Sequence, residues 1–277
     1  HVEIQFWKTK HRGQCWNAVG RDAAGNLYLG NSTHRSHSYA YRMDARTRQM
    51  RYLGDIYDLV RFGAPGGADN GKIHSSFVEG PDGCMYFLSH YGRMRQIRYG
   101  GHLWKYDPKA DRILDLGVPA PGNTSFCTTA VDPVRNCIYM MSTPGGLFIR
   151  YDFATQSFTA LGRSGMNWVR HMPMDRDGNV YVVGEGKVRR FDPVTEKWEV
   201  VAENAEPFGP MTGYCWTADR RRLYLLNYVE GRVFTWTPGE KIVTELGWMH
   251  PKRTPLYIYN IHLSADETRL FSIGASG

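Results

Sequence analysis

Short apolar segments bounded by glycine, asparagine or aspartate recur along the whole chain. One type carries an aromatic residue inside a strand-like run after a turn, as in Gly25–Leu29 and Gly178–Val182. The aromatic recurs at 28, 86, 139, 181, 224 and 271, so successive spacings are 58, 53, 42, 43 and 47 residues. Self-similarity at such spacings indicates a repeat fold.

Each aromatic strand belongs to a larger unit. It follows an apolar run such as Ser76–Val78 or Thr129–Val131, and it precedes a strand that ends in a turn, such as Trp104–Pro108. An outer strand such as Ile113–Gly117 closes the unit. Four strands per unit predict an all-β fold of the β-propeller class. No sustained helical period occurs, so we expect few helices. A β-sandwich or irregular barrel is the alternative, but neither repeats one motif so often.

The repeat predicts one β-propeller domain over residues 1–277. Five units are complete, and the sixth stops after its second strand. Residues 1–10, with the apolar run Val2–Trp7, resemble an outer strand without its inner partners. We therefore expect a seven-bladed propeller that is incomplete at its termini; closure with six blades, which would remove the exposed edge, is the alternative.

The composition is that of a globular protein, with 42% hydrophobic and 22% charged residues among 277. This excludes disorder as the general description of the chain. No run approaches the roughly 20 apolar residues of a membrane span, and no signal peptide is visible. The net charge of +7 favours a polyanionic partner. The basic residues form no recognised nucleic-acid motif, so we expect no nucleic acid, and we expect a monomer.

Chemistry-bearing residues gather where the predicted strands end at one mouth of the propeller. His74 begins an inner strand and His90 ends the next strand, so a hairpin would bring them side by side. His34 and His37 occupy the equivalent loop of the preceding unit. Histidines at such a place can move protons near neutral pH.

A basic stretch without acids surrounds His90. Between Gly83 and Tyr106 there is no aspartate or glutamate. The cations of this stretch are Arg93, Arg95, Arg98 and Lys105. These arginines, with His34 and His37, are candidates for binding an anionic substrate, although a solvated basic loop would show the same composition.

The five cysteines form no CxxC pair, so a disulfide framework is not readable. Cys15, Cys215 and His262 occupy similar registers of inner strands, and His171 shares their face pattern. Four such ligands would form a structural zinc site. Buried cysteines and hydrogen-bonded core histidines are the alternative. We expect no organic cofactor.

Three segments, namely Lys72–Ser76, the strand Met85–Phe87 running into His90, and Gly100–Asp107, resemble the β-propeller polysaccharide lyases of the ulvan lyase type. The resemblance implies a seven-bladed propeller that cleaves a uronate-containing sulfated polysaccharide by β-elimination, and a structural zinc in some members. It matches His74 and His90 to the paired active-site histidines.

The family's tyrosine and arginine one blade further on have no counterpart here. The corresponding places hold Phe126-Cys127 and Ser142-Thr143. Tyr91 is the candidate acid in their stead, and Arg170 is a further candidate for holding the substrate carboxylate.

We therefore predict a secreted or periplasmic polysaccharide lyase whose partner is an anionic polysaccharide. A base would remove the C5 proton of the uronate while a cation neutralises its carboxylate. A non-catalytic propeller that binds an anionic glycan or a protein partner is the main alternative. A propeller enzyme with another chemistry, such as a metal-dependent hydrolase, is the third.

Overall fold

The structure is a computed structural model, which describes residues 9–11, 13–15, 17–33, 37–60, 72–90, 100–121, 125–143, 145–204, 208–228, 230–249 and 256–276. The chain divides into two compact units, His1–Asn136 and Cys137–Gly277. In the described residues the only helix is α1 (Ile56–Val60), and the other regular elements are β-strands. The predicted all-β class is thus confirmed.

The first unit is built from antiparallel sheets in which consecutive strands pair. The first sheet has the order β1-β2-β3-β4, and in the second sheet the short inner strands β5 and β6 both pair with β7, which is followed by β8 and β9. The strand β10 is the last of this unit and meets β7 where Ser125 lies opposite His90. The bounds are β1 (Val19–Arg21), β2 (Leu27–Ser32), β3 (Ser38–Met43), β4 (Met50–Asp55), β5 (Lys72–Ile73), β6 (Val78–Glu79), β7 (Met85–His90), β8 (Leu103–Asp107), β9 (Arg112–Asp115) and β10 (Ser125–Asp132).

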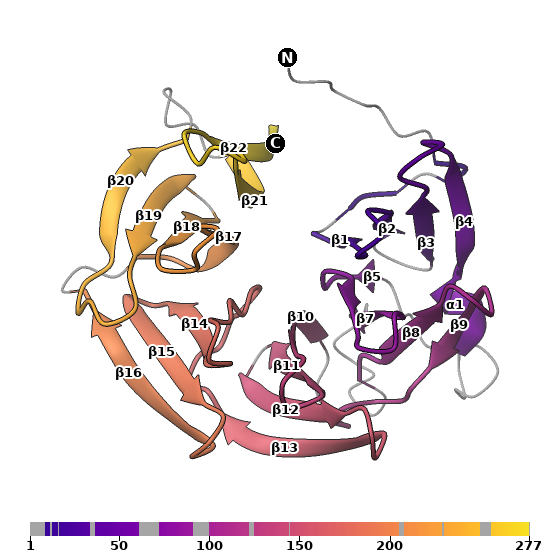
Figure 1. Cartoon of the computed structure of the whole chain (residues 1–277), viewed down its shortest axis with the longest axis horizontal. Helices are drawn as coiled ribbons and strands as arrows, with labels where there is room; N and C mark the ends of the chain where they lie inside the picture. The colour runs from indigo at the N-terminus through magenta and orange to yellow at the C-terminus, as the bar shows by residue number, and fades with distance from the viewer. Residues whose placement is uncertain are drawn as a thin grey trace. The chain divides into compact units, whose positions relative to one another are not determined.

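The second unit repeats the same meander. The strands β17 to β20 lie side by side in sequence order (Figure 1), and an isolated bridge between Met174 and Val180 takes the place of an inner strand before β14. The bounds are β11 (Cys137–Thr143), β12 (Leu147–Asp152), β13 (Ser157–Arg163), β14 (Val180–Gly184), β15 (Lys187–Asp192), β16 (Lys197–Glu203), β17 (Met211–Trp216), β18 (Leu223–Asn227), β19 (Arg232–Trp236), β20 (Thr244–Trp248), β21 (Leu256–Leu263) and β22 (Leu270–Ser276).

The predicted repeats coincide with these sheets. The six aromatic strands are β2, β7, β11, β14, β18 and β22, and the sixth set contains only β21 and β22 in the described residues, as expected. Beside this pair of strands, the described residues form five blades. A total of seven, or six, stays a prediction, as does the single domain over 1–277. Most of the proposed N-terminal outer strand, residues 1–8, lies outside the described residues.

A tyrosine–aspartate contact explains why the aromatic residue recurs. The phenol of Tyr181 donates to Asp175 at 2.7 Å, and Asp175 also accepts from the backbone and the side chain of Asn179. The phenols of Tyr28 and Tyr86 donate to Asp22 and Asp82 in the same way, at 3.0 and 2.9 Å. One carboxylate therefore joins a turn to the strand that follows it.

The hairpins between the third and fourth strands of the units also share one design. Asp152 accepts hydrogen bonds from the backbone of Ala154 and Thr155, which hold the pKa of its carboxyl below the usual range. Four residues after the aspartate, Gln156 has a left-handed backbone with φ of 53°. The same pairing of aspartate and left-handed residue occurs at 44 and 48, 107 and 111, and 192 and 196.

Hydrophobic cores lie between successive sheets. In the first unit, aromatic side chains of β2 and β8 meet, with the rings of Tyr28 and Tyr106 5.9 Å apart. A side chain at Gly30 of β2 would come within 2.8 Å of the Cβ atom of Ile73, so only glycine permits this approach. In the second unit, the ring of Tyr181 packs edge-on against Trp236 at 5.2 Å.

We predict that Tyr181→Phe lowers the free energy of unfolding by about 1–2 kcal/mol, because it removes a hydrogen bond to a carboxylate while keeping the packed ring. Urea unfolding followed by fluorescence measures the change. Tyr224→Phe is the matched control, since in the described part of the chain Tyr224 makes no such bond. Equal losses in the two variants would contradict the stabilising role of the Tyr181–Asp175 contact.

Candidate functional site

Of the residues that the sequence indicated for catalysis and binding, the structure describes His37, His74, His90 and Arg170. It also describes the four proposed zinc ligands. The remaining candidates lie outside the described residues, namely His34, Tyr91, Arg93, Arg95 and Arg98.

His74 and His90 lie side by side in the first unit. β5 pairs with β7 so that Lys72 is opposite His90, and the backbone amide of His74 donates to the carbonyl of Leu88 at 3.3 Å. The two imidazole rings are stacked, with centroids 5.3 Å apart and planes inclined by 17°. His74 is 6% exposed, whereas His90 is partly exposed. The hairpin thus brings the pair together as expected, and its chemical role stays a prediction.

Buried serine hydroxyls fix the strands that carry the pair. Ser75 accepts a hydrogen bond from the amide of Leu88 at 2.7 Å, and Ser89 accepts one from the amide of His102 at 2.9 Å. Both serines are fully buried. Because these bonds tie the backbone on either side of the histidines, the rings are held in place before any ligand arrives.

His102 is a third histidine of this sheet, which sequence reasoning did not single out. Its Nδ1 atom lies 2.9 and 3.0 Å from the two carboxylate oxygens of Asp115, and its ring stacks on Trp104 at 5.6 Å. The contact joins the residue before β8 to the end of β9. We interpret His102 as a structural residue that fixes the backbone beside Ser89.

His37 is engaged within the first unit rather than standing alone in a loop. Its Nδ1 atom is 2.5 Å from a carboxylate oxygen of Asp55, which is buried and also accepts from the amides of Ser38 and Tyr57. The His37 ring stacks on Tyr39 with centroids 5.6 Å apart. The buried carboxylate holds the imidazole in place, and the proposed part of His37 in substrate binding stays a prediction.

Arg170 lies in the second unit against two adjacent aromatic rings. Its guanidinium carbon is 4.5 Å from the centroid of Trp168 and 5.0 Å from that of Tyr228. The two rings meet edge-on at 5.5 Å. Sequence reasoning selected Arg170 but missed the rings, because Tyr228 follows β18, 60 positions after Trp168, and no local pattern connects them.

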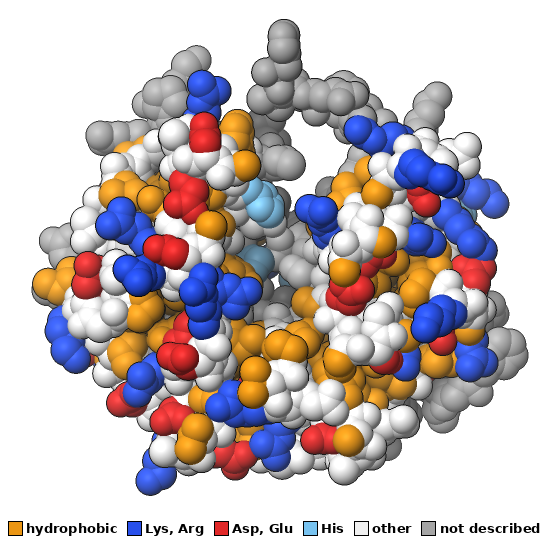
Figure 2. All heavy atoms as spheres, viewed as in Figure 1, with side chains coloured by type: hydrophobic (Ala, Val, Ile, Leu, Met, Phe, Trp, Pro, Cys, Tyr) orange, Lys and Arg blue, Asp and Glu red, His pale blue; other side chains and the backbone are white. Residues whose placement is uncertain are grey.

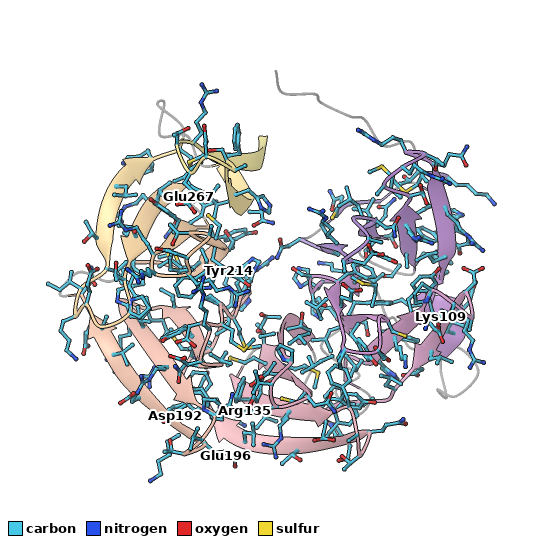
Figure 3. The ribbon with its side chains drawn as sticks, viewed as in Figure 1. Lys109, Arg135, Asp192, Glu196, Tyr214 and Glu267 are labelled. Atoms are coloured by element: carbon cyan, nitrogen blue, oxygen red, sulfur yellow. The ribbon has the colours of Figure 1, made fainter. Side chains whose placement is uncertain are left out.

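His171 and its neighbours form an uncharged group beside this arginine. Burial, followed by the positive charges of Arg170 and His262, lowers the pKa of His171 to about 4, although a hydrogen bond with the backbone of Thr212 opposes the shift. Burial also raises the pKa of Tyr214, which is labelled in Figure 3. Its ring packs edge-on against that of His171, with centroids 5.4 Å apart. Near pH 7 both side chains are therefore neutral.

The proposed zinc ligands do not form a recognisable metal centre. In the ranges that the structure describes, no group of three or more histidine, cysteine, aspartate or glutamate side chains is arranged to hold a metal ion. Cys15 belongs to the first unit and the other three to the second. Burial raises the pKa of the Cys215 thiol to about 12, so this thiol is neutral near pH 7. Structural zinc therefore stays a prediction from the sequence.

The surface charge is mixed. On the face shown in Figure 2, basic and acidic side chains are interspersed within each unit. Ion pairs such as Arg150 with Glu196 at 2.7 Å and Lys187 with Glu203 at 2.9 Å are part of this pattern. No helix among the described residues is long and apolar enough to cross a membrane.

Comparison with known proteins identifies the fold. No protein-family model and no curated protein matches the chain. Among solved structures, a catalytically inactive virginiamycin B lyase from Staphylococcus aureus with quinupristin is 12% identical, with a TM-score of 0.70 over 98% of this chain and 81% of that one.

Two further similar structures come from Bacteroides thetaiotaomicron. An auxiliary nutrient binding protein is 15% identical, with a TM-score of 0.63 over 95% of this chain and 67% of that one. The extracellular domain of a putative hybrid two-component system is 14% identical, with a TM-score of 0.65 over 97% of this chain; this chain spans only 32% of it. The chain therefore has a β-propeller fold, and identities this low establish the fold alone.

We predict that the protein loses stability as the pH falls from 6.5 to 4. His171 titrates near 4 in the folded chain and near 6.5 when unfolded, so the unfolded state binds more protons in this window. The loss should be on the order of 1–3 kcal/mol, measured by urea unfolding at several pH values. His171→Gln should flatten the slope, while His102→Asn in the first unit should retain it. An unchanged slope in His171→Gln would show that His171 does not carry the effect.

Proposed function

We propose that this β-propeller is a secreted or periplasmic lyase that cleaves a uronate-containing, sulfated polysaccharide of the ulvan kind by β-elimination. The observation that supports it is the stacked pair of His74 and His90, carried on paired strand ends. The resemblance of residues 72–108 to ulvan-type lyases agrees with this pair. We also propose that the protein acts as a monomer.

The pair suits proton transfer because its members differ in exposure. His90 is partly exposed and can meet a substrate, whereas His74 is buried behind it. A neutral imidazole near neutral pH is a competent base.

In the proposed reaction, His90 removes the proton from C5 of the uronate. The released electron pair forms the double bond between C4 and C5 as the bond from C4 to O4 breaks, and an acid returns a proton to O4. Tyr91, next in the chain, is the proposed acid. Arg93, Arg95 or Arg98 would neutralise the carboxylate, which makes the enolate-like intermediate accessible.

A binding protein without catalysis is the second candidate. One observation favours it: two of the similar structures are auxiliary nutrient binding proteins from Bacteroides species. In that case the strand ends around His90 would hold an anionic glycan without cleaving it. The two candidates differ in one respect that can be measured, namely the formation of an unsaturated product.

Structural zinc, through Cys15, His171, Cys215 and His262, is a separate proposal from the sequence that the described geometry does not favour. Elemental analysis of the purified chain tests it. Stoichiometric zinc that is lost in Cys215→Ser would support it, and zinc at trace level would refute it.

We predict that the chain releases products with the ultraviolet absorbance of unsaturated uronates from ulvan or a related uronate polymer. His90→Ala should lower the rate about 100-fold or more, because it removes the general base. His74→Ala should lower it as well, since the stacked partner is lost. His102→Asn, whose amide can replace the contact to Asp115, is the control and should stay near the parent rate.

The opposite results are equally clear. If no polymer in a panel of uronate polysaccharides yields an unsaturated product, the lyase is excluded. If binding to the same polymers then survives the double variant His74→Ala and His90→Ala, the binding protein is the correct description.

A further inference from the structure

The short strand that leads into His74 depends on contacts with the first sheet. β5 consists of two residues, and its pairing with β7 covers only two positions. A pairing this short gives little stability on its own. The contacts that hold Ile73, the residue before His74, therefore decide where the imidazole lies.

Ile73 is held by β2 of the neighbouring sheet. Its backbone amide donates to the hydroxyl of Ser32, the last residue of β2, at 2.9 Å. A Cβ atom at Gly30 would lie only 2.8 Å from the Cβ atom of Ile73, so the isoleucine side chain lies directly against β2. Ile73 is fully buried and Ser32 is 1% exposed. Loss of the hydroxyl would therefore leave a buried amide without its acceptor.

Ser32 also joins β2 to the N-terminal segment, which comprises residues 9–11 and 13–15 in the described part of the chain. Its backbone amide donates to the carbonyl of Gln14 at 2.9 Å, and its carbonyl accepts from the amide of Gln14 at 2.8 Å. The side-chain amide of Asn31 donates to the carbonyl of His11 at 2.8 Å. Ser32 thus contacts the N-terminal segment with its backbone and β5 with its hydroxyl.

His11 anchors the N-terminal segment on the first sheet. Its ring stacks on that of Tyr39, with centroids 4.0 Å apart and planes inclined by 14°, and lies 5.0 Å from the ring of Tyr52. Its Nδ1 atom is 2.8 Å from the hydroxyl of Tyr41, which also accepts from the backbone amide of His11 at 3.2 Å. A continuous series of contacts therefore leads from the N-terminal segment through Ser32 to the histidine pair.

We propose that Ser32 is a positioning residue for the histidine pair, and that it makes the geometry of the pair depend on the docking of the N-terminal segment. Its hydroxyl fixes the backbone at Ile73 and thereby the ring of His74, which stacks on that of His90 at 5.3 Å. The consequence for catalysis rests on the proposed function, whereas the effect on the pair does not.

Three variants of the full chain separate the hydroxyl of Ser32 from the volume of its side chain. Ser32→Ala removes the hydroxyl. Ser32→Thr and Ser32→Val have the same shape, but only threonine keeps a hydroxyl. Ser142→Ala is the matched control in the second unit, because Ser142 is also fully buried and its hydroxyl accepts from the amide of Leu147 at 3.0 Å.

Hydrogen exchange and NMR test the geometry of the pair without any substrate. In Ser32→Ala and Ser32→Val, the amide of Ile73 should exchange at least about tenfold faster than in the parent chain. The nuclear Overhauser effect between the rings of His74 and His90, recorded with labelled histidine, should weaken or disappear in both variants. Ser32→Thr and Ser142→Ala should behave like the parent.

Circular dichroism verifies that each variant is folded, and Ser32→Ala carries the test if Ser32→Val is not. Parent-like exchange and an unchanged ring contact in the folded variant would overturn the proposal. An equal disturbance in Ser32→Thr and Ser32→Val, with Ser32→Ala like the parent, would also overturn it, because the added volume rather than the lost hydroxyl would then be the cause.

His11→Ala tests the dependence on the N-terminal segment. It removes the ring that stacks on Tyr39 and the side-chain contact with Tyr41, so the amide of Ser32 should exchange at least about tenfold faster. The ring contact between His74 and His90 should weaken as it does in Ser32→Ala. Faster exchange at Ser32 with an unchanged ring contact would refute the influence of this segment on the pair.

The lyase assay adds a catalytic test. In an active parent, Ser32→Val should lower kcat about tenfold or more and leave KM within about twofold, because the substrate still binds while the base is displaced. Ser32→Thr and Ser142→Ala should keep both constants, and an unchanged kcat in Ser32→Val would refute the positioning role. A parent without lyase activity excludes the proposed catalysis alone, since hydrogen exchange and NMR still decide the role of Ser32.

Discussion

The structure depends on burying large aromatic side chains between successive antiparallel sheets. Tyr28, Tyr106, Tyr181 and Trp236 are almost completely buried, and each packs against an aromatic ring of the neighbouring sheet. A four-stranded meander has two apolar faces and is not stable alone, so each sheet needs a neighbour to cover it. The buried tyrosines also carry a hydroxyl, and a turn aspartate satisfies it in three of the repeats, at Tyr28, Tyr86 and Tyr181. One residue type therefore serves both packing and turn formation.

The same architecture explains where chemistry can arise. In an antiparallel pair, the beginning of one strand lies beside the end of the next. Residues that are far apart in the sequence therefore become neighbours there. His74 and His90 use this within one sheet. A second cluster joins two repeats of the second unit and consists of Trp168, Arg170 and Tyr228. The two clusters differ in kind, because the first offers groups that titrate and the second offers a permanent charge.

The sequence predicted the repeats well because their signals are local. An aromatic residue after a turn and an aspartate at the end of the third strand each reflect contacts within a few positions, such as Tyr181 with Asp175. The histidine pair could also be predicted, because a hairpin brings residues sixteen positions apart into contact. The pairing of His37 with Asp55 and the rings around Arg170 were not, because these contacts depend on the packing of side chains. The zinc hypothesis had the weakest basis in the sequence, because similar registers on different strands do not by themselves bring ligands together.

The hairpins built on Asp44, Asp107, Asp152 and Asp192 have a consequence for how such a chain can change over time. Each closes within a few residues through fixed backbone bonds, and the left-handed position four residues later leaves little freedom in length. At the opposite ends of the strands, the described residues share no such common turn. The repeats can therefore accumulate insertions and new side chains at one end while the other end preserves the register. Repeats of one design thereby carry sites as different as a histidine pair and an arginine packed against two rings.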